Sequence, residues 1–417
     1  MALLVQKYGG SSVGTLERIR HVASKVVKAR KQGHDVVVVV SAMQGETDRL
    51  IRLAEALIDC PTPREYDALV STGEQVSMSL VAMALNAVDC PALSLTGHQV
   101  GIITDEAHTK ARILDVKTER IQKELKKGHV VIIAGFQGIN ANNDITTLGR
   151  GGSDTTAVAL AIALKADECQ IYTDVEGVYT TDPRMIPEAQ LLSEISFEEM
   201  LEMASLGAKV LQMRSVELAN KHNMPIRVLS TFSDTPGTLV TFEEKIMEKR
   251  LVSGIAFSRE EALIAINGVP SQAGIEGRIL GLVSDANIEI DMIAQNATDK
   301  DTSDFTFTLS RKDYPHTLKI IQALAKELNA ASVKSNPKVA KLSLVGIGMR
   351  SHTGVASKMF QALGSVGVNI QMITTSEIKI SVVIAEDFLD KSVQAVHDAF
   401  ELDKLQPLDK PKMVLEA

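Results

Sequence analysis

The first half of the chain alternates short apolar runs with longer segments of helical periodicity. Residues 35–40 (DVVVVV) and 129–136 are nearly continuous apolar runs, typical of strands buried on both faces. Segments whose apolar residues recur every three or four positions lie between such runs and predict helices. The expected strands are 3–7, 35–40, 92–95, 129–136, 168–173 and 226–229, and the expected helices are 15–31, 47–58, 74–87, 116–127, 154–165 and 197–220. This order predicts an α/β fold with a mostly parallel sheet sandwiched by helices.

The pattern changes after Phe242, where the charged segment 243–250 predicts a linker. Beyond it the chain repeats itself, because Leu263–Gln295 aligns without gaps on Ser343–Thr375, a shift of 80 residues. Each copy reads as strand, helix, strand, strand, helix, which are the first five elements of a ferredoxin-like βαββαβ domain. The expected domains are 1–245, then 246–262 as a linker and joining strand, then 263–340 and 341–417 as two small domains.

Composition narrows the possible functions. The net charge of −8 and the 4% aromatic content, with no tryptophan, argue against nucleic-acid binding through a basic or stacking surface. The three cysteines are far apart and form no zinc-ligand pattern, which indicates reduced thiols in a cytoplasmic protein. The N-terminus has no signal-peptide pattern, and the apolar runs are too short to span a bilayer.

The sequence LGRGGSDTTA, residues 148–157, carries the strongest chemical signal. Its glycines precede an expected helix, so free backbone N–H groups at the positive end of the helix dipole can bind an anion. Arg150 can bind a carboxylate or phosphate through two hydrogen bonds. Asp154 can cap the helix or hold a substrate group or metal, so a plain capped turn remains the alternative interpretation.

Other motifs follow the expected strands at the edge where ligands gather in open α/β sheets. Lys7 and the glycines after it have the composition of a phosphate-binding turn, although they form neither a Walker A loop nor G-x-G-x-x-G. Ser41 follows a buried strand. Glu74 is expected in the first turn of a helix, where complementing the helix dipole is the alternative role. The loop 172–184 can hold an adenine and ribose, and Lys209, expected within a helix, can reach a phosphate; solvated surface is the alternative for both.

Six of these motifs, in this order, resemble those of the aspartate kinases of the amino acid kinase family. They are KYGGSSVG, VVVSAM, STGEQ, LGRGGSDTTA, YTDVEGVYTTDPR and GAKVL. The repeat behind them is similar to the paired ACT domains of the same enzymes, so the resemblance covers essentially the whole chain. It implies transfer of the γ-phosphoryl group of ATP to L-aspartate, with Mg²⁺ on the phosphates. The product would be 4-phospho-L-aspartate, the first intermediate toward diaminopimelate and lysine, threonine and methionine.

The resemblance also implies roles for individual residues. Lys7 and Asp154 would be catalytic, with Lys7 stabilising charge on the transferred group and Asp154 organising the lysine. Substrate would be bound by Ser41, Thr47, Glu74, Arg150, Gly151, Gly152 and Ser153, where Glu74 faces the ammonium group and Arg150 the α-carboxylate. ATP would be bound by Lys7, Gly9, Gly10, Thr173, Asp174, Tyr179, Arg184 and Lys209. No protein metal ligand is assigned.

The ACT pair implies feedback inhibition by lysine, threonine or both, and concerted inhibition is favoured. The effector-binding residues would be Gly274, Asp291, Gln295, Asn369, Ile370, Ser351, His352, Thr353 and Ser376. Two departures from the usual pattern occur. Residues 271–274 (SQAG) replace an Asp-x-Pro-Gly-like turn, which puts the contact to the effector's amino group in doubt. The segment 207–215 lacks the usual histidine-proline after its leucine, with little expected consequence.

Alternatives from the same and from other classes remain. Another carboxylate kinase of the family would act on glutamate or acetylglutamate. A non-catalytic ACT-type amino acid sensor would have no use for Lys7, Arg150, Asp154 and Lys209 together. No dinucleotide-binding half follows the second repeat, so fusion to homoserine dehydrogenase is not expected. A homo-oligomer formed through the ACT domains is expected, and Met247 is a candidate internal start for a separate regulatory subunit.

Overall fold

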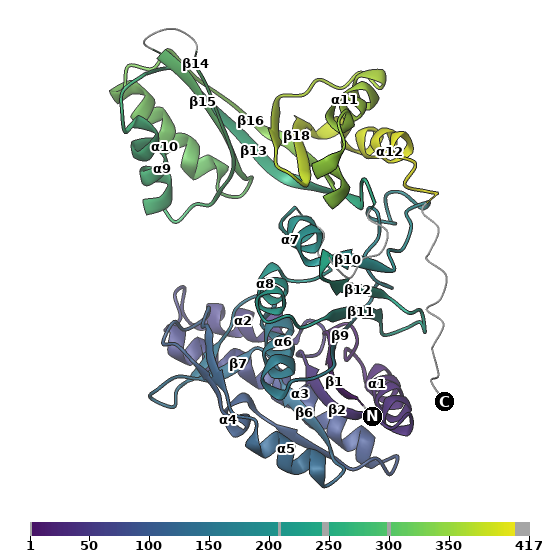
Figure 1. The fold of residues 1–417 in the computed structure, drawn as a ribbon. Helices are drawn as coiled ribbons and strands as arrows, with labels where there is room; N and C mark the ends of the chain where they lie inside the picture. Colours follow the sequence, from purple (N-terminus) through teal and green to yellow (C-terminus); the bar gives the residue numbers. More distant parts are fainter. Residues whose placement is uncertain (1, 207–209, 244–249, 298–301, 405–417) are drawn as a thin grey trace.

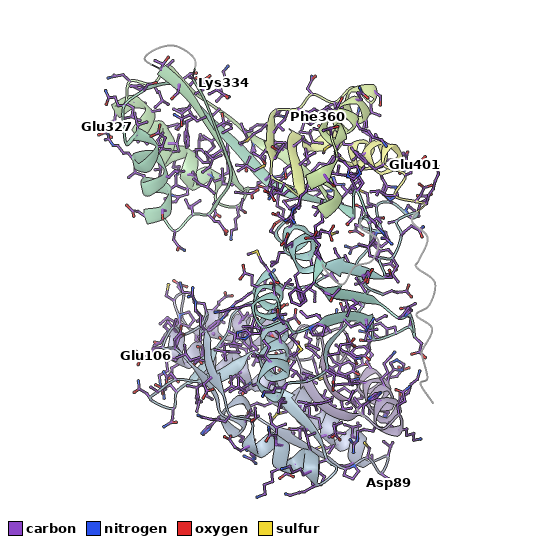
Figure 2. All side chains as sticks on the ribbon, viewed as in Figure 1. Asp89, Glu106, Glu327, Lys334, Phe360 and Glu401 are labelled. Atoms are coloured by element: carbon purple, nitrogen blue, oxygen red, sulfur yellow. The ribbon has the colours of Figure 1, made fainter. Side chains whose placement is uncertain are left out.

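The computed structural model describes residues 2–206, 210–243, 250–297 and 302–404. The chain forms an α/β domain and, behind it, a second sheet that carries the two copies of the repeat (Figure 1). Side chains fill the space between sheet and helices in both parts (Figure 2).

The α/β domain is built on an eight-stranded sheet of order β10-β12-β11-β9-β1-β2-β6-β3. The pairings are parallel except for β11 with β12. Its strands are β1 (Leu3–Tyr8), β2 (Asp35–Val40), β3 (Ala92–Leu95), β6 (Val130–Ala134), β9 (Glu168–Thr173), β10 (Glu194–Ser196), β11 (Ile226–Ser230) and β12 (Thr238–Thr241). The mostly parallel sheet predicted from the sequence is confirmed.

Helices cover both faces of this sheet, which is why β2 needs valine on both sides. Val36, Val38 and Val40 pack toward α1 (Leu16–Lys31) and α3 (Pro63–Asn86). Val37 and Val39 pack in the core on the opposite face. That core includes residues of α5 (Glu119–Lys126), α6 (Gly152–Leu164), α7 (Phe197–Ser205) and α8 (Met213–Lys221).

Three sequence-based boundaries were wrong. The helix expected from Glu74 begins at Pro63, a favourable first residue for a helix, so Glu74 lies in mid-helix rather than in a first turn. The single helix expected over 197–220 is two helices, α7 and α8, because α7 ends at Ser205 and α8 begins at Met213. The helix expected from Val116 begins at Glu119, since Ile113–Val116 is a strand.

A second small sheet of the α/β domain was missed. Its order is β5-β4-β7-β8, and its strands are β4 (Ile102–Thr104), β5 (Ile113–Val116), β7 (Gln137–Ile139) and β8 (Ile145–Thr147). The short helices α2 (Glu46–Leu57) and α4 (Gly97–Val100) complete the domain. Strands of three or four residues are too short to show a period of two.

Helix α3 is long and apolar enough, by length and composition alone, to cross a membrane. Half of the relevant window is buried in the protein, where α3 contributes Met78, Val81 and Leu85 to the core beneath α1 and the sheet. It is therefore a core helix of this fold.

The repeat forms one six-stranded sheet of order β14-β15-β13-β16-β18-β17. Its strands are β13 (Gly254–Pro270), β14 (Ile290–Ala297), β15 (Thr302–Ser310), β16 (Ser332–Val345), β17 (Met372–Thr375) and β18 (Lys379–Ala385). Helices α9 (Ile275–Asp285) and α10 (Tyr314–Glu327) cover the first copy, and α11 (Val355–Ser365) and α12 (Leu389–Ala399) the second. The predicted shift of 80 residues holds, because α9 and α11 begin and end 80 residues apart.

Two long strands run through both copies. The end of β13 pairs with the start of β16 (Asn267 with Ser332) in the first copy. The start of β13 pairs with the end of β16 (Gly254 with Val345) in the second. Ile255 accordingly packs in the core of the second copy, so this copy takes one strand from residues that precede the first copy in the chain.

Candidate active site

The carboxyl ends of four parallel strands meet at one edge of the large sheet. Backbone hydrogen bonds connect the residues that follow the strands: Gly9 N–H donates to the Tyr172 carbonyl, Ser41 N–H to that of Tyr8, and Gly135 N–H to that of Val40. Lys7 lies one residue before the end of β1 and Thr173 ends β9. The topology therefore brings together β1 and β9, whose paired residues, such as Tyr8 and Tyr172, are 164 positions apart in the sequence.

Lys7 and Asp154 form an ion pair at this edge. The Lys7 Nζ lies 2.6 Å from Asp154 Oδ1, and the side chains are 13% and 9% exposed. Asp154 stands in the first turn of α6, where the helix dipole favours a negative charge. The pair holds the ammonium group of Lys7 in a fixed place, next to the backbone of Gly9.

Glu74 joins this pair from α3. The Ser153 hydroxyl donates to Glu74 Oε1 at 2.7 Å, while Oε2 has no hydrogen-bond partner among the described residues. Burial raises the pKa of the Glu74 carboxyl to about 8, against the opposing effects of the Ser153 hydrogen bond and the Lys7 charge. A cationic ligand group next to Glu74 would favour the ionised form of this carboxyl and could occupy the oxygen that has no partner among the described residues.

The turn between β8 and α6 depends on close backbone approaches. Gly151 has a φ of 71° and caps α6, and a Cβ atom there would lie 1.9 Å from Gln212 Cγ. A Cβ on Gly135 would lie 2.8 Å from the Ser153 Cβ. These contacts seat the start of α6 against the end of β6 and present Ser153 and Asp154 to Glu74 and Lys7.

Arg150 is exposed at this turn, and its guanidinium group makes no hydrogen bond or ion pair with the described residues. Gly152 follows it as the first residue of α6. Thr47 is half-buried in the first turn of α2, and Ser41 is half-buried after β2. Helix α3 approaches α2 closely, since a Cβ on Gly73 would meet Ala42 and Leu50 side chains.

The residues predicted to bind the nucleotide lie in different surroundings. Thr173 and Asp174 are at the end of β9, with the Thr173 hydroxyl donating to Asp174 Oδ1. Arg184 is highly exposed and paired with Asp182 at 2.7 Å. Tyr179 packs against the core of the second repeat copy. Of the two glycines predicted to bind the nucleotide, Gly9 and Gly10, Gly9 donates its backbone N–H to the Tyr172 carbonyl. Lys209 lies outside the described residues.

The predicted effector residues divide between the two copies. In the first, Asp291 is ion-paired with Lys341, and the Gln295 amide donates to Glu276 Oε1 at 2.9 Å. Gly274 and its counterpart Gly354 are the N-cap residues that precede α9 and α11. In the second, Ser351, His352 and Thr353 are exposed in one loop. Asn369 and Ser376 are exposed, and Ile370 packs against the core of this copy.

Sequence reasoning missed two charged groups near the glycine turn, one buried and one half-buried. Asp67 on α3 is fully buried and accepts a hydrogen bond from the hydroxyl of Thr147, just before the turn. Arg214 on α8 donates to the carbonyl groups of Leu148 and Ala111. Asp67 precedes Glu74 by seven residues, a helical spacing that would have indicated a shared face had the helix been predicted from Pro63.

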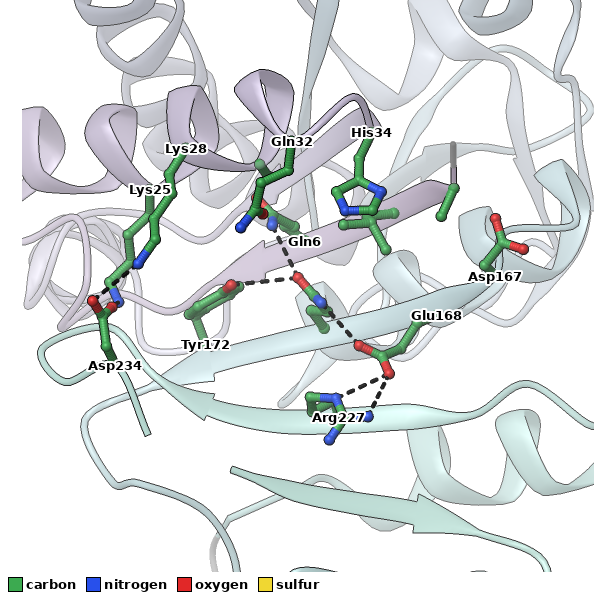
Figure 3. A pocket seen from close by; sticks show the side chains of 14 residues that line it. Gln6, Lys25, Lys28, Gln32, His34, Asp167, Glu168, Tyr172, Arg227 and Asp234 are labelled. Atoms are coloured by element: carbon green, nitrogen blue, oxygen red, sulfur yellow. Dashed lines mark hydrogen bonds and ion pairs between the residues drawn. The ribbon is translucent and has the colours of Figure 1, made fainter. Parts of the chain in front are cut away.

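A pocket of about 480 Å³ lies elsewhere, on the sheet face beside α1 (Figure 3). Gln6 donates to Gln170, Gln170 donates to Glu168, and Arg227 binds Glu168. Gln6 and Lys7 are adjacent on β1 and point to opposite faces. The pocket is therefore separate from the Lys7–Asp154 site, and these polar groups satisfy one another.

The comparisons with known proteins agree with this geometry. The amino acid kinase family model matches residues 2–230, and ACT domain models match residues 264–326 and 342–400. An aspartate kinase of Stutzerimonas stutzeri (strain A1501) is 60% identical over 404 residues, which cover 97% of this chain and 98% of that protein.

Two solved structures of E. coli aspartokinase III are similar along the whole chain. One, in complex with aspartate and ADP in the R-state, is 27% identical with a TM-score of 0.78 and covers 95% of this chain and 99% of that one. The other, with lysine and aspartate in the T-state, is 28% identical with a TM-score of 0.77 and the same coverage.

The chain therefore belongs to the amino acid kinase family. Within it, the chain falls among the aspartate kinases that carry two ACT domains, so it is an ATP-using enzyme with a regulatory region. The family and the fold predicted from the sequence are both confirmed.

Proposed function

We propose that the chain transfers the γ-phosphoryl group of ATP to the β-carboxylate of L-aspartate, giving 4-phospho-L-aspartate and ADP. A β-carboxylate oxygen attacks the γ-phosphorus; a new O–P bond forms while the bond to the β,γ-bridging oxygen breaks. Such a reaction needs positioning and charge neutralisation rather than a protein nucleophile. The observation that carries the proposal is the largely buried cluster of Lys7, Asp154, Ser153 and Glu74, together with Arg150, which lies in the preceding turn and whose guanidinium group has no partner among the described residues.

The substrate's two ends would be held from two elements. Glu74, with its unused oxygen, binds the ammonium group, and Arg150 binds the α-carboxylate. The helix N-terminus at Gly151, Gly152 and Ser153 adds a positive potential near that carboxylate. Ser41, after β2, and Thr47, in the first turn of α2, are proposed to contact the substrate as well.

Lys7 stabilises negative charge on the transferred group, and Asp154 holds its ammonium in place at 2.6 Å. Gly10 is the backbone donor for the phosphates, since the Gly9 N–H is bound to Tyr172. Thr173, Asp174, Tyr179 and Arg184 border the nucleotide, and Lys209 contacts its phosphates.

Magnesium would neutralise phosphate charge in this reaction. No group of three or more metal-ligating His, Cys, Asp or Glu side chains occurs among the described residues. We propose that the ion is held mainly by the phosphates of ATP, as Mg²⁺ commonly binds through one or two carboxylates and substrate phosphates.

The ACT copies are proposed to bind lysine and threonine and to inhibit together. The lysine complex of E. coli aspartokinase III supports an amino acid effector. The sites are assigned to Gly274, Asp291, Gln295, Ser351, His352, Thr353, Asn369, Ile370 and Ser376. Asp291 would have to exchange Lys341 for the effector's ammonium group. The pathway is that toward diaminopimelate and lysine, threonine and methionine.

The assembly is proposed to be a homo-oligomer formed through the ACT domains, whose edge strands β14 and β17 expose Ile293 and Ile373 at matched positions. A regulatory subunit starting at Met247, outside the described residues, is also proposed. The three free cysteines fit a cytoplasmic location. The boundaries 1–245, 246–262, 263–340 and 341–417 remain our proposal.

The test is an assay that traps acyl phosphate with hydroxylamine in the presence of ATP, Mg²⁺ and aspartate. We expect Arg150→Ala to raise the KM for aspartate about tenfold or more, with the KM for ATP nearly unchanged, because a charge-assisted bidentate contact is lost. Arg20→Ala, at an exposed arginine on α1, is the matched control.

Other outcomes would select the alternatives. Turnover of glutamate or acetylglutamate in place of aspartate would identify another carboxylate kinase. Binding of lysine or threonine with no acyl phosphate from any substrate would identify a sensor. An unchanged aspartate KM in Arg150→Ala would remove the role of Arg150 alone.

A further inference from the structure

Asp67 is a fully buried carboxylate that binds two separate segments of chain. Its oxygens accept hydrogen bonds from the Thr147 N–H at 3.0 Å and the Thr147 hydroxyl at 2.6 Å. They also accept from the Thr109 N–H at 2.9 Å, and His108 Nδ1 lies 2.9 Å away. Burying a carboxylate is costly unless it is fully hydrogen-bonded, and here the donors are provided by loop 105–112 and strand β8.

Both segments lead to the glycine turn that carries Arg150. Thr147 ends β8, three residues before Arg150. The Thr109 carbonyl oxygen lies 3.0 Å from where a Cβ on Gly149 would be. The Ala111 N–H donates to the Thr147 carbonyl at 2.9 Å. The base of the turn is therefore held by Asp67 through Thr147 and through the loop packed on Gly149.

Asp67 is also on the helix that carries Glu74. Seven residues separate them on α3, which places both on nearly the same face, and both side chains are buried. One rigid helix thus carries Glu74 itself and, through Asp67, holds the turn of Arg150. Helix α3 therefore sets the distance between Glu74 and the turn that carries Arg150.

We propose that Asp67 is a positioning residue that fixes the Arg150 turn relative to Glu74 and thereby sets the affinity for the amino acid substrate. The inference rests on the proposed function, in which Glu74 and Arg150 hold the ammonium and α-carboxylate groups of one molecule. Those groups are a fixed distance apart in every α-amino acid, so a displaced turn weakens binding of the substrate and leaves the nucleotide side unaffected.

The main test is Asp67→Asn, which keeps the volume but turns one acceptor into an NH₂ donor that faces N–H groups. We expect the KM for aspartate to rise about tenfold or more, since small displacements of a positioned group have large effects. The KM for ATP should stay within about twofold of the parent value. Thr147→Val is a milder variant that removes the 2.6 Å hydrogen bond alone, and it should raise the aspartate KM less.

Glu124→Gln is the matched control, because Glu124 on α5 is also a buried carboxylate that binds a histidine (His129, 2.9 Å). His129 directly precedes the start of β6, whereas the glycine turn lies next to Gly135, beyond the end of that strand. Glu124→Gln should leave both KM values unchanged. Equal increases in both KM values for Asp67→Asn and Thr147→Val, or loss of stability alone, would overturn the proposal and leave Asp67 as a structural residue.

A double-mutant cycle separates this inference from the proposed function. If Asp67 acts through Arg150, Asp67→Asn should add little to the aspartate KM of Arg150→Ala. Additive effects would overturn the inference while the role of Arg150 stands. An Arg150→Ala variant with a normal aspartate KM, beside an Asp67→Asn variant with a raised one, would contradict both the role of Arg150 and the route proposed for Asp67.

Discussion

The two ACT copies share a sequence pattern but have different neighbours. Figure 1 shows the second copy above α7 of the α/β domain, while helices α9 and α10 of the first copy lie to one side. The difference centres on one loop. Asn267 and Gly268 of the first copy are partly exposed, whereas their counterparts Ile347 and Gly348 are buried; residues 271–274 and 351–354 are exposed in both copies.

Three glutamates of α7 contact the second copy or the segment that leads into it. Arg350 binds Glu198 at 2.6 Å, and Lys379 binds Glu202 at 2.8 Å. Between them, Glu199 is buried and accepts hydrogen bonds from the Ile347 N–H at 2.9 Å and the Ser253 hydroxyl at 2.6 Å.

The matching positions of the first copy are occupied differently. Pro270 stands where the second copy has Arg350, and the Gly268 N–H donates to Asp304 within its own copy. A duplicated loop has thus become a contact to the α/β domain in one copy and has stayed open in the other. An effector bound near Ser351, as proposed, would lie next to a direct contact with α7, whereas one bound in the first copy would have to act through the shared strands β13 and β16.

The largest effect is expected at Glu199. Glu199→Ala leaves the Ile347 N–H and the Ser253 hydroxyl without an acceptor inside the interface, so we expect the free energy of unfolding to fall by about 3 kcal/mol. Denaturant unfolding measures this. Asp304→Ala, the matched change in the first copy, should lose about 1 kcal/mol. Equal losses would show that the two loops are equivalent.

A smaller effect is expected where the copies join. Lys341 is buried and binds Asp291 and, at 3.9 Å, Glu261. Lys341→Met should destabilise the protein by about 2 kcal/mol at neutral pH, because carboxylates lose their partner. Burial raises the pKa of Glu261, so its contribution to stability falls as pH rises from the unfolded pKa through the folded one. The loss of stability in Lys341→Met should therefore be smaller at acidic pH than at neutral pH. Thermal unfolding of the parent and the variant across pH measures this, and a loss that grows as the pH falls would contradict the prediction.

Arg350→Ala tests whether the contact with α7 transmits inhibition. Arg350 is partly exposed, so we expect less than about 1 kcal/mol of lost stability. The concentration of lysine plus threonine for half-inhibition should rise about fivefold, the low end of typical couplings, with uninhibited kcat preserved. Pro270→Ala is the control in the first copy. An unchanged inhibition curve for Arg350→Ala would assign transmission to another contact.

The smallest effect is expected from removing one hydroxyl. Ser351→Ala should raise the half-inhibition concentration about twofold to threefold, and Ser271→Ala, at the matched position, should do less. Dose–response curves for each amino acid alone and for the mixture measure this. A larger effect at Ser271 would show that the first loop is the main effector contact.

The sequence predicted those elements whose patterns are long or continuous. The run 35–40 gave β2 with its correct bounds, because valine is needed on both faces of a central strand. The gapless repeat located α9 and α11. The predicted start of helix α3, at Glu74, was too late because Ser71, Thr72 and Gly73 are residues typical of a turn. In the structure Gly73 lies within the helix, where the absence of a side chain lets α2 pack closely.

The sequence predicted which residues make up the candidate site better than it predicted the contacts between them. Lys7, Glu74, Arg150, Ser153 and Asp154 were named from the sequence. The structure pairs Lys7 with Asp154 and Ser153 with Glu74, and Arg150 lies in the exposed turn just before α6. Asp67 was missed because its partners lie 41, 42 and 80 residues away, beyond any local pattern. Strands as short as β7 and β8 are stabilised by such partners, so they too cannot be predicted from local sequence.

The exchange of strands between the ACT copies makes the first copy an insertion. Ser258 on β13 and Lys341 on β16 are direct antiparallel partners, although the whole first copy lies between them in the chain. A two-residue hairpin turn joining them would complete the sheet of the second copy with the first copy deleted. The topology thus marks where the regulatory region can be shortened to a single ACT unit that keeps its contact with the catalytic domain.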